Sequence, residues 1–283
     1  MKNIHDNNID LSLVVATHQG KNRLENLIKS VLNSSDIPRE IIIVGTNQED
    51  IGNIEKYNAN LNIIFKISQH KNQVYQRKIG LDLASCNFIL QLDDDIRLEK
   101  NTLSILYSEI KNKNSKRIIA GTLVNENYEP ADIRWVTAYN KYYLIRLIVF
   151  LLNNFKKVRP NSLIYSGRPI PHINNDKSEI EWLNSSLCFH KDSLKDYCRY
   201  KSFGKSYYED IYTSHNYFCK GYKLDKIKNA ILIHPNTQKF SLFDHIKSIK
   251  NQNIIVKTFS KSYIFFFLDV VIFSFIFLVR KIK

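Results

Sequence analysis

Phe88-Ile89-Leu90-Gln91-Leu92-Asp93-Asp94-Asp95 is the stretch that decides the fold. Its first five residues are nearly all apolar and predict a buried strand, which runs directly into three aspartates. Adjacent carboxylates repel one another unless a cation or solvent compensates their charge. In an extended segment Asp93 and Asp95 point to one side and Asp94 to the other. A solvated turn is the alternative, but the apolar run favours a bound hard cation, Mn²⁺ or Mg²⁺.

Apolar runs alternate with helically spaced segments before this strand. Five segments show the alternation: 11–17, 24–32, 41–44, 61–67 and 73–84. The pattern predicts an α/β fold with a mostly parallel sheet flanked by helices. Ligands bind such sheets at the carboxyl ends of the strands. Thr17-His18-Gln19 and Gly45-Thr46-Asn47 also follow predicted strand ends, so we expect them to meet the aspartates in one crevice.

A second acidic pair lies in the less regular half of the chain. Residues 117–123 and 230–233 are predicted strands, and residues 206–221 contain a predicted helix. Glu209 and Asp210 fall in the first turn of that helix, where the helix dipole stabilises an anion. A deprotonated carboxylate there suits a general base. Plain N-terminal capping is the alternative interpretation of the pair.

Charge and cysteine content limit the class of protein. The 283 residues carry a formal charge of +14, which favours anionic lipid, nucleic acid or phosphorylated substrates. A lysine-rich composition from an AT-rich genome is an alternative source of part of that charge. The four cysteines form no Cys-x-x-Cys pair and the histidines form no cluster with zinc spacing, which fits a reducing cytoplasm. Residues 1–10 lack the apolar core of a secretory signal, so we expect a cytoplasm-facing protein.

Two apolar segments indicate membrane contact. Residues 263–279 are apolar apart from Asp269 and Ser274, and basic residues follow at 280–283. As a helix this segment would be about 25 Å long, which is marginal against a hydrocarbon core of about 30 Å, so it either spans the membrane or lies in its interface. Residues 139–157 form a second candidate surface helix, for which a buried core helix is an equal alternative. Anionic lipid would attract the positive charge.

The order and spacing of the motifs resemble the family 2 glycosyltransferases over about residues 10–235. Four segments carry the resemblance: residues 11–19 (opening strand and donor loop), Gln76-Arg77-Lys78-Ile79-Gly80 (basic segment), Leu92-Asp93-Asp94-Asp95 (Asp-x-Asp motif) and Tyr208-Glu209-Asp210 (Glu-Asp motif). The resemblance implies a GT-A nucleotide-diphospho-sugar transferase fold over residues 1–240. Its donor half would cover about 10–123 and its acceptor half about 124–240, and residues 241–283 would form a C-terminal, membrane-associating hydrophobic helix.

The resemblance also implies residue roles in a metal-dependent, inverting transfer from a nucleotide sugar. Asp93 and Asp95 would belong to the metal site: Asp93 would contact the ribose or metal-bound water, and Asp95 would ligate Mn²⁺ or Mg²⁺. His234 follows a predicted strand, where it would be a further metal ligand or a structural histidine. Asp210, with Glu209 beside it, would be the catalytic base. The implied donor-binding residues are Thr17, Gln19, Thr46, Asn47, Arg77, Lys78, Asp93 and Asp94.

The sequence departs from the family pattern in two places. Family members commonly carry a base-reading aspartate after the second strand, and here residues 45–50 stand in its place. Thr46 or Asn47 would then hydrogen-bond the base, with a UDP-sugar as the expected donor. Gln76-Arg77-Lys78 replaces the usual Ala-Arg-Asn. Trp182 either stacks on a sugar or lies in the core.

We therefore expect a glycosyltransferase of bacterial surface polysaccharide synthesis at the cytoplasmic face of the inner membrane. Its acceptor would be a saccharide or a lipid-linked molecule, and no nucleic acid partner is expected. A sugar-phosphate nucleotidyltransferase is the alternative, but it needs a Gly-rich or basic phosphate loop, and residues 17–21 contain one glycine. A basic protein that binds by charge alone would leave the aspartates unexplained.

Overall fold

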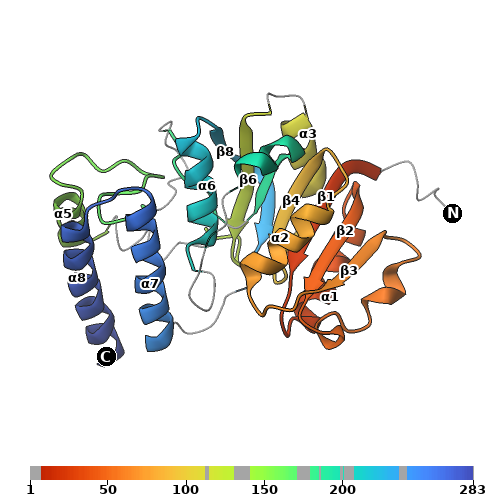
Figure 1. The fold of residues 1–283 in the computed structure, drawn as a ribbon, viewed down its shortest axis with the longest axis horizontal. Coiled ribbons are helices and arrows are strands. Elements are labelled where there is room, and N and C mark those ends of the chain that lie inside the picture. Colours follow the sequence, from red (N-terminus) through yellow and green to blue (C-terminus); the bar gives the residue numbers. More distant parts are fainter. Residues whose placement is uncertain are drawn as a thin grey trace.

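A curled sheet runs through the molecule, and helices cover both of its faces (Figure 1). The computed structural model describes residues 8–111, 115–130, 141–170, 179–184, 186–197, 200, 207–235 and 241–282. The strands are β1 (Asn8–Ala16), β2 (Ile37–Gly45), β3 (Ile63–Ile67), β4 (Phe88–Asp93), β5 (Arg97–Leu98), β6 (Arg117–Val124), β7 (Leu187–His190) and β8 (Lys223–Ile233). The α-helices are α1 (Lys21–Leu32), α2 (Gln73–Leu83), α3 (Thr102–Lys111), α5 (Tyr143–Leu152), α6 (Glu209–Cys219), α7 (Leu242–Thr258) and α8 (Tyr263–Ile282).

The strand order is β3-β2-β1-β4-β7-β6-β8-β5. The first four strands of the chain are parallel neighbours, joined by helices or loops that cross over the sheet. Strand β7 pairs antiparallel with both β4 and β6, β6 and β8 are parallel, and β5 is antiparallel to β8. The predicted α/β fold with a mostly parallel sheet is thus confirmed for the first half, whereas the second half mixes directions. Strands β5 and β7 were not predicted because two to four residues are too few to show a period.

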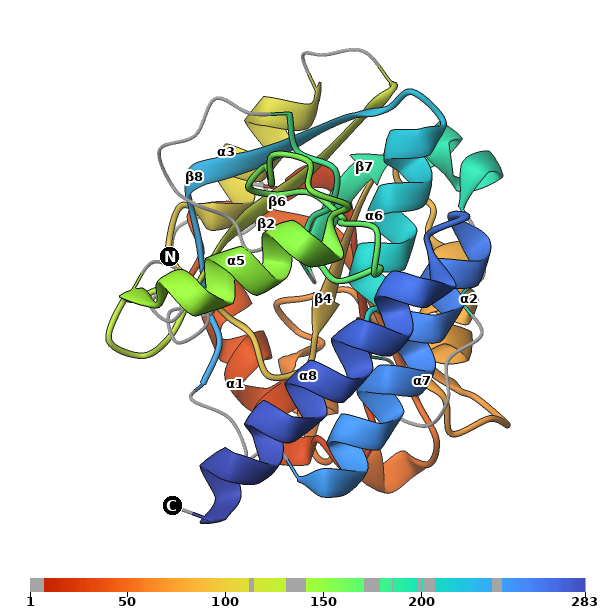
Figure 2. The same cartoon turned by 90° about the vertical axis from the view of Figure 1, so that its left-hand side faces the viewer.

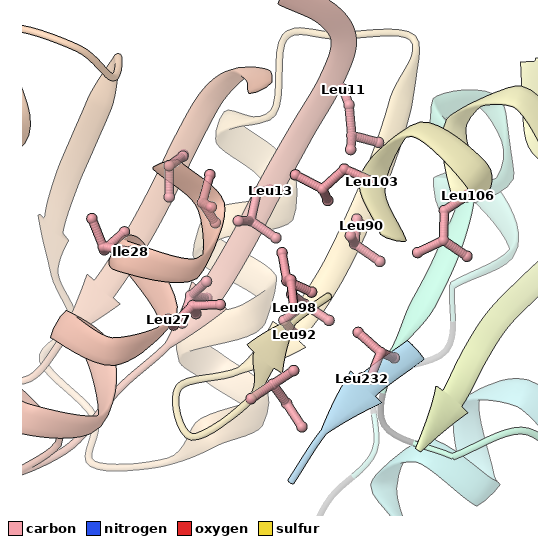
Figure 3. Close-up of a cluster of buried hydrophobic side chains, with 14 of the residues drawn as sticks. Leu11, Leu13, Leu27, Ile28, Leu90, Leu92, Leu98, Leu103, Leu106 and Leu232 are labelled. Carbon is pink, nitrogen blue, oxygen red and sulfur yellow. The ribbon is translucent and has the colours of Figure 1, made fainter. Parts of the chain in front are cut away.

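The alternation of side chains along the strands divides the core into two layers. Leu11 and Leu13 of β1 point to the face covered by α1 and α3 (Figure 3). Val14 points to the opposite face, which α2 covers. Gly80 lets α2 approach closely, because a Cβ there would lie 2.5 Å from Cγ1 of Val14. Both layers hold the carboxyl ends of β1, β2 and β4 at one edge of the sheet.

The C-terminal helices form a separate layer at the end of the molecule farthest from β3 (Figure 1). Helix α7 begins at a capping box between Ser241 and Asp244, and α8 runs alongside it in Figure 2. The predicted apolar segment 263–279 is thus a helix, and it extends to Ile282. None of the helices within the described residues is both long enough and apolar enough to cross a membrane. The single-pass alternative for this segment therefore finds no support.

Asp269 explains how α8 is held on the protein. Its carboxylate is fully buried and accepts hydrogen bonds from Nε and Nη2 of Arg168, both at 2.7 Å. Ser166 Oγ and Gln252 Nε2 also donate to it, each at 3.2 Å. The only acidic residue of this apolar helix thus points inward, away from solvent. The network ties α8 to α7 and to the loop at residues 166–168.

We predict that Asp269→Ala lowers the free energy of unfolding by about 3–5 kcal/mol, because it leaves Arg168 buried without its counter-ion. Urea unfolding followed by circular dichroism measures the change. Asp82→Ala is the control, since its carboxylate is 58% exposed and pairs with Lys78 on the surface of α2; we expect a loss below about 1 kcal/mol. The double variant Arg168→Met, Asp269→Leu should recover most of the loss. Equal stability of Asp269→Ala and the unchanged protein would contradict the assignment.

Candidate active site

Asp50 joins the loops that follow β1 and β2. Its buried carboxylate accepts hydrogen bonds from the backbone N–H of Gln19 and of Thr46, both at 2.6 Å, and from the Thr46 hydroxyl at 2.8 Å. Although burial opposes it, these donors hold the pKa of Asp50 below its usual value. The Asn47 side chain accepts from the Asp50 N–H at 3.0 Å. Asp50 thus fixes the residues predicted to read the base, and the Thr46 hydroxyl already donates within the protein.

Gln76 holds the same two strand ends from the other side. Its Nε2 donates to the carbonyl of Thr17 at 2.6 Å and to that of Val44 at 2.8 Å. Gln19, in the loop after β1, has a φ of 52°, a strained backbone conformation of the kind that clusters at functional sites. Gln76, which stands where the usual pattern has alanine, thus joins the carboxyl ends of β1 and β2, where the predicted site residues meet.

Both carboxylate oxygens of Asp94 accept hydrogen bonds from side chains of the protein. Its Oδ2 accepts from the Thr17 hydroxyl at 2.6 Å and from Nη2 of Arg23 at 3.2 Å, and its Oδ1 accepts from Nε of Arg23 at 3.1 Å. Gly20 makes room for this carboxylate, because a Cβ there would lie 2.0 Å from Oδ2. Asp94 and Thr17, both predicted to bind the donor, therefore form one bracket between β4 and the start of α1.

Arg77 connects the two acidic motifs. Its guanidinium is buried and pairs with Asp93 at the end of β4 and with Glu209 at the start of α6. Gln73 Nε2 also donates to Asp93 Oδ1, at 2.8 Å. Burial lowers the pKa of Arg77, but Glu209 and Asp93 outweigh it and raise that pKa above its ordinary value. A permanently charged group thus pairs with a carboxylate 132 positions away in the chain.

Glu209 and Asp210 occupy different environments. Glu209 is buried behind Arg77; burial raises its pKa, and Arg77 opposes that rise. Asp210 is half-buried, and its Oδ1 accepts from the N–H of Ile211 at 2.9 Å. Tyr208 precedes them with a φ of 67°, which turns the chain sharply into α6. Glu209 is therefore placed to hold Arg77, whereas Asp210 is the carboxylate that solvent reaches.

Asp95 and His234 form the candidate metal centre. His234 Nε2 lies 3.6 Å from Asp95 Oδ2, and its Nδ1 lies 2.9 Å from the Pro235 carbonyl. An Nδ1–H donated to that carbonyl leaves the Nε2 lone pair facing Asp95, which is the tautomer of a metal ligand. Asp95 Oδ1 is buried and has no hydrogen-bond partner among the described residues. Burial raises the pKa of Asp95, and His234 opposes that rise.

These donors fit a hard divalent cation that keeps most of its ligands from substrate and water. Across the residues that the structure describes, no three His, Cys, Asp or Glu side chains converge to enclose a metal. Asp93, the third predicted ligand, turns instead to Arg77 and Gln73. The arrangement therefore offers two protein ligands, Asp95 and His234, on one side of an open position.

The cluster carries more negative than positive charge. Five carboxylates lie near two guanidinium groups, Arg23 and Arg77. The charges of Asp93 and Asp94 act on Asp95, and those of Asp93 and Asp210 act on Glu209. With all five carboxylates ionised and a neutral histidine, the formal balance is negative by three charges. Adjacent carboxylates at this density require further positive charge, which the divalent cation would supply.

Two predicted residues lie elsewhere. Lys78 pairs with Asp82 along the outer side of α2, not with the Asp93 cluster. Trp182 is buried among Val74 and other core residues, and its Nε1 donates to the Ile170 carbonyl at 3.2 Å, so the core interpretation is the one that the structure supports.

Sequence reasoning missed Asp50, Arg23 and Gln73. Each of them acts through a partner far away in the chain, and nothing in their own segments indicates those partners. The one sequence feature that pointed to a close approach in this region was Gly20, a glycine at the start of a predicted helix.

The sequence matches one family model, and the fold is similar to that of solved structures. The model of the family described as "Glycosyl transferase family 2" matches residues 12–168. The fold is similar to S. aureus TarS 1–349, at 15% identity and a TM-score of 0.55, over 88% of this chain and 65% of that one. It is also similar to GalNAc-T7 solved with UDP, GalNAc and Mn²⁺, at 14% identity and a TM-score of 0.58, over 87% of this chain and 47% of that one.

A complex of TarS 1–349 with UDP-GlcNAc shows the same similarity, at 14% identity and a TM-score of 0.55, over 88% of this chain and 66% of that one. This chain thus spans about two thirds of the TarS fragment and about half of GalNAc-T7. No curated protein matches the sequence. At these identities the solved structures establish the fold, which is GT-A as predicted.

We predict a strong energetic coupling between Arg77 and Glu209. Arg77→Met, Glu209→Gln and the double variant form a cycle, and urea unfolding should give a coupling free energy of about 1–3 kcal/mol. The single variant Arg77→Met should lose about 3–5 kcal/mol, since it leaves two carboxylates facing one another without their cation. Arg97→Met, which removes an exposed pair with Glu126, is the control and should cost less than about 1 kcal/mol. Additive single effects would refute the bridge.

Proposed function

This chain belongs to glycosyl transferase family 2, and we propose that it transfers a sugar from a nucleotide-sugar donor to an acceptor hydroxyl. The observation that carries the proposal is the cluster of five carboxylates, at the end of β4 and the start of α6, that outnumber the two guanidinium groups beside them. A site of this kind suits a cation-bound diphosphate on one side and proton removal on the other. The TarS structure with UDP-GlcNAc and the GalNAc-T7 structure with UDP support a UDP-sugar as the donor.

Asp95 and His234 would hold Mn²⁺ or Mg²⁺, with the donor's diphosphate and water as the remaining ligands. The ion supplies positive charge that stabilises the departing nucleoside diphosphate. The structure of GalNAc-T7 with Mn²⁺ supports this choice of ion. Asp93, fixed by Arg77 and Gln73, is placed to receive the ribose. Asp50 shapes the base pocket by holding the loop at Thr46 and Asn47.

Asp210 is the proposed general base. It is a half-buried member of the acidic cluster, and it lies in the first turn of α6, where the helix dipole favours its charged form. A deprotonated Asp210 would take the proton of the acceptor hydroxyl as that oxygen attacks the anomeric carbon from the face opposite the diphosphate. A single in-line displacement inverts the configuration. Glu209 acts indirectly by holding Arg77 against Asp93.

We further propose a saccharide or lipid-linked acceptor of bacterial surface polysaccharide synthesis, with the protein at the cytoplasmic face of the inner membrane. The S. aureus origin of TarS supports a bacterial setting. The formal charge of +14 supports anionic surroundings. The sugar-phosphate nucleotidyltransferase alternative predicts release of pyrophosphate, whereas the proposed reaction releases a nucleoside diphosphate, so the product separates the two.

We predict that Asp95→Ala and Asp210→Asn each lower turnover of the nucleotide sugar at least about a hundredfold, the scale on which a general base contributes to rate. Release of nucleoside diphosphate in the presence of Mn²⁺ is the measurement. The two variants should differ in donor binding: Asp95→Ala weakens it, and Asp210→Asn leaves it near normal. Asp192→Asn, on an exposed carboxylate beside His190, is the matched control. Full activity of Asp210→Asn would remove Asp210 from the mechanism.

We also predict that removal of divalent ions weakens binding of a nucleoside diphosphate at least about tenfold, because the negative cluster then repels the phosphates. Titration calorimetry with UDP, before and after chelation and after return of Mn²⁺, measures the effect. His234→Ala should reduce the Mn²⁺-dependent part of the affinity, whereas His190→Ala, at a half-buried histidine that pairs with Asp192, should not. Equal UDP affinity with and without the metal would disprove the proposed ion.

A further inference from the structure

Helix α8 has an apolar stripe that no other described element covers. Six side chains on it are 49–73% exposed: Ile264, Phe267, Leu268, Val271, Phe275 and Leu278. At 100° per residue these positions fall within about 100° of one another around the helix. Asp269 and Phe266 are on the other side and are buried. Helix α8 is thus fastened to the protein along one face and bare along the opposite one.

Helix α5 repeats this arrangement. Leu144, Leu147 and Leu151 are 37–65% exposed along one side of it. Its buried residues Ile145 and Val149 pack in one cluster with side chains of α8. Both helices lie at the same end of the molecule and face the viewer in Figure 2. Because they share their inner contacts, their bare stripes point outward together; we call these nine residues the α5–α8 face.

Most of the net charge of the chain lies in the two segments that carry this face. Residues 141–170 and 241–283 together contain 13 Lys and Arg but 2 Asp and Glu, so they carry +11 of the total +14. Both acids are engaged within the protein: Asp244 caps α7 and Asp269 pairs with Arg168. Lys141 and Lys157 are exposed beside α5. The surroundings of the apolar stripes are therefore positive.

We propose that the α5–α8 face docks in the interface of an anionic lipid bilayer, with both helices lying in the plane of the membrane. Apolar stripes bordered by basic side chains match the acyl boundary and the anionic headgroups, respectively. A second copy of the chain is a poor occupant, because it would bring another +11 against the first. The Arg168–Asp269 pair holds the inner side of α8 on the protein, so the helix enters the interface by its stripe alone.

Docking at this face also bears on the acceptor of the reaction. This consequence rests on the proposed function. The α7 helix lies between α8 and α6 (Figure 1), and Ser248 of α7 donates to the Tyr208 hydroxyl at 3.4 Å. Tyr208 immediately precedes Glu209 and Asp210. The proposed base is thus one helix layer from the docked surface, which suits an acceptor whose lipid anchor stays in the same membrane.

Vesicle sedimentation of the full chain tests the proposal. We expect the protein to bind phosphatidylcholine vesicles that contain phosphatidylglycerol, to bind pure phosphatidylcholine weakly, and to release with rising salt. Phe267→Glu, Phe275→Glu should weaken binding about tenfold or more, because it removes two exposed aromatic groups that docking would bury in the lipid. The matched control, Ile67→Glu, Leu83→Glu, places the same charges at exposed apolar positions remote from the face and should bind as the unchanged protein does. Alkaline carbonate should extract the bound protein.

Three results would overturn the docking: no binding to anionic vesicles, equal binding by the two double variants, or resistance to carbonate. A Phe267→Glu, Phe275→Glu variant that changes the oligomeric state but not vesicle binding would also overturn it, in favour of self-association. Hydrolysis of the nucleotide sugar in Mn²⁺, without membranes, reports separately on the proposed function. Vesicle binding without any such hydrolysis leaves the docking standing and removes the catalytic proposal.

Discussion

The buried guanidinium of Arg77 is the interaction on which the rest of the site depends. A charge buried this deeply costs several kcal/mol unless partners surround it, and its partners here come from different halves of the chain, Asp93 on β4 and Glu209 on α6. Because the guanidinium fork pairs with both at once, the start of α6 is held against the end of β4. That contact sets the position of Asp210 relative to the aspartates at the end of β4.

The five acidic residues of the cluster are chemically distinct although they look alike in the sequence. Asp94 is saturated by Thr17 and Arg23, and Glu209 is buried against Arg77. Asp95 keeps a buried oxygen that has no hydrogen-bond partner among the described residues, and Asp210 is half-buried. Part of the acidic charge of the cluster therefore forms contacts within the protein. The remainder is proposed to bind a cation and to accept a proton.

The C-terminal layer separates structure from surface in the same way. The inner side of α8 carries the Asp269 network, which closes hydrogen bonds to α7 and to the loop at residues 166–168. Its outer side is apolar and exposed. An ion pair that is too costly to expose to lipid is therefore directed inward, and the same helix is free to present its apolar side outward.

The sequence alone determined the alternation of strands and helices, the end of β4 at three aspartates, and the acidic turn of α6, because periodicity and the clash of charges with an apolar run are local signals. It also marked residues 263–279 as an apolar helix with one misplaced acid. It did not reveal that Thr46 bonds to Asp50, that Lys78 faces away, or that Asp269 is paired with Arg168. Those facts depend on contacts between distant segments, which exist only once the sheet and its helices have packed.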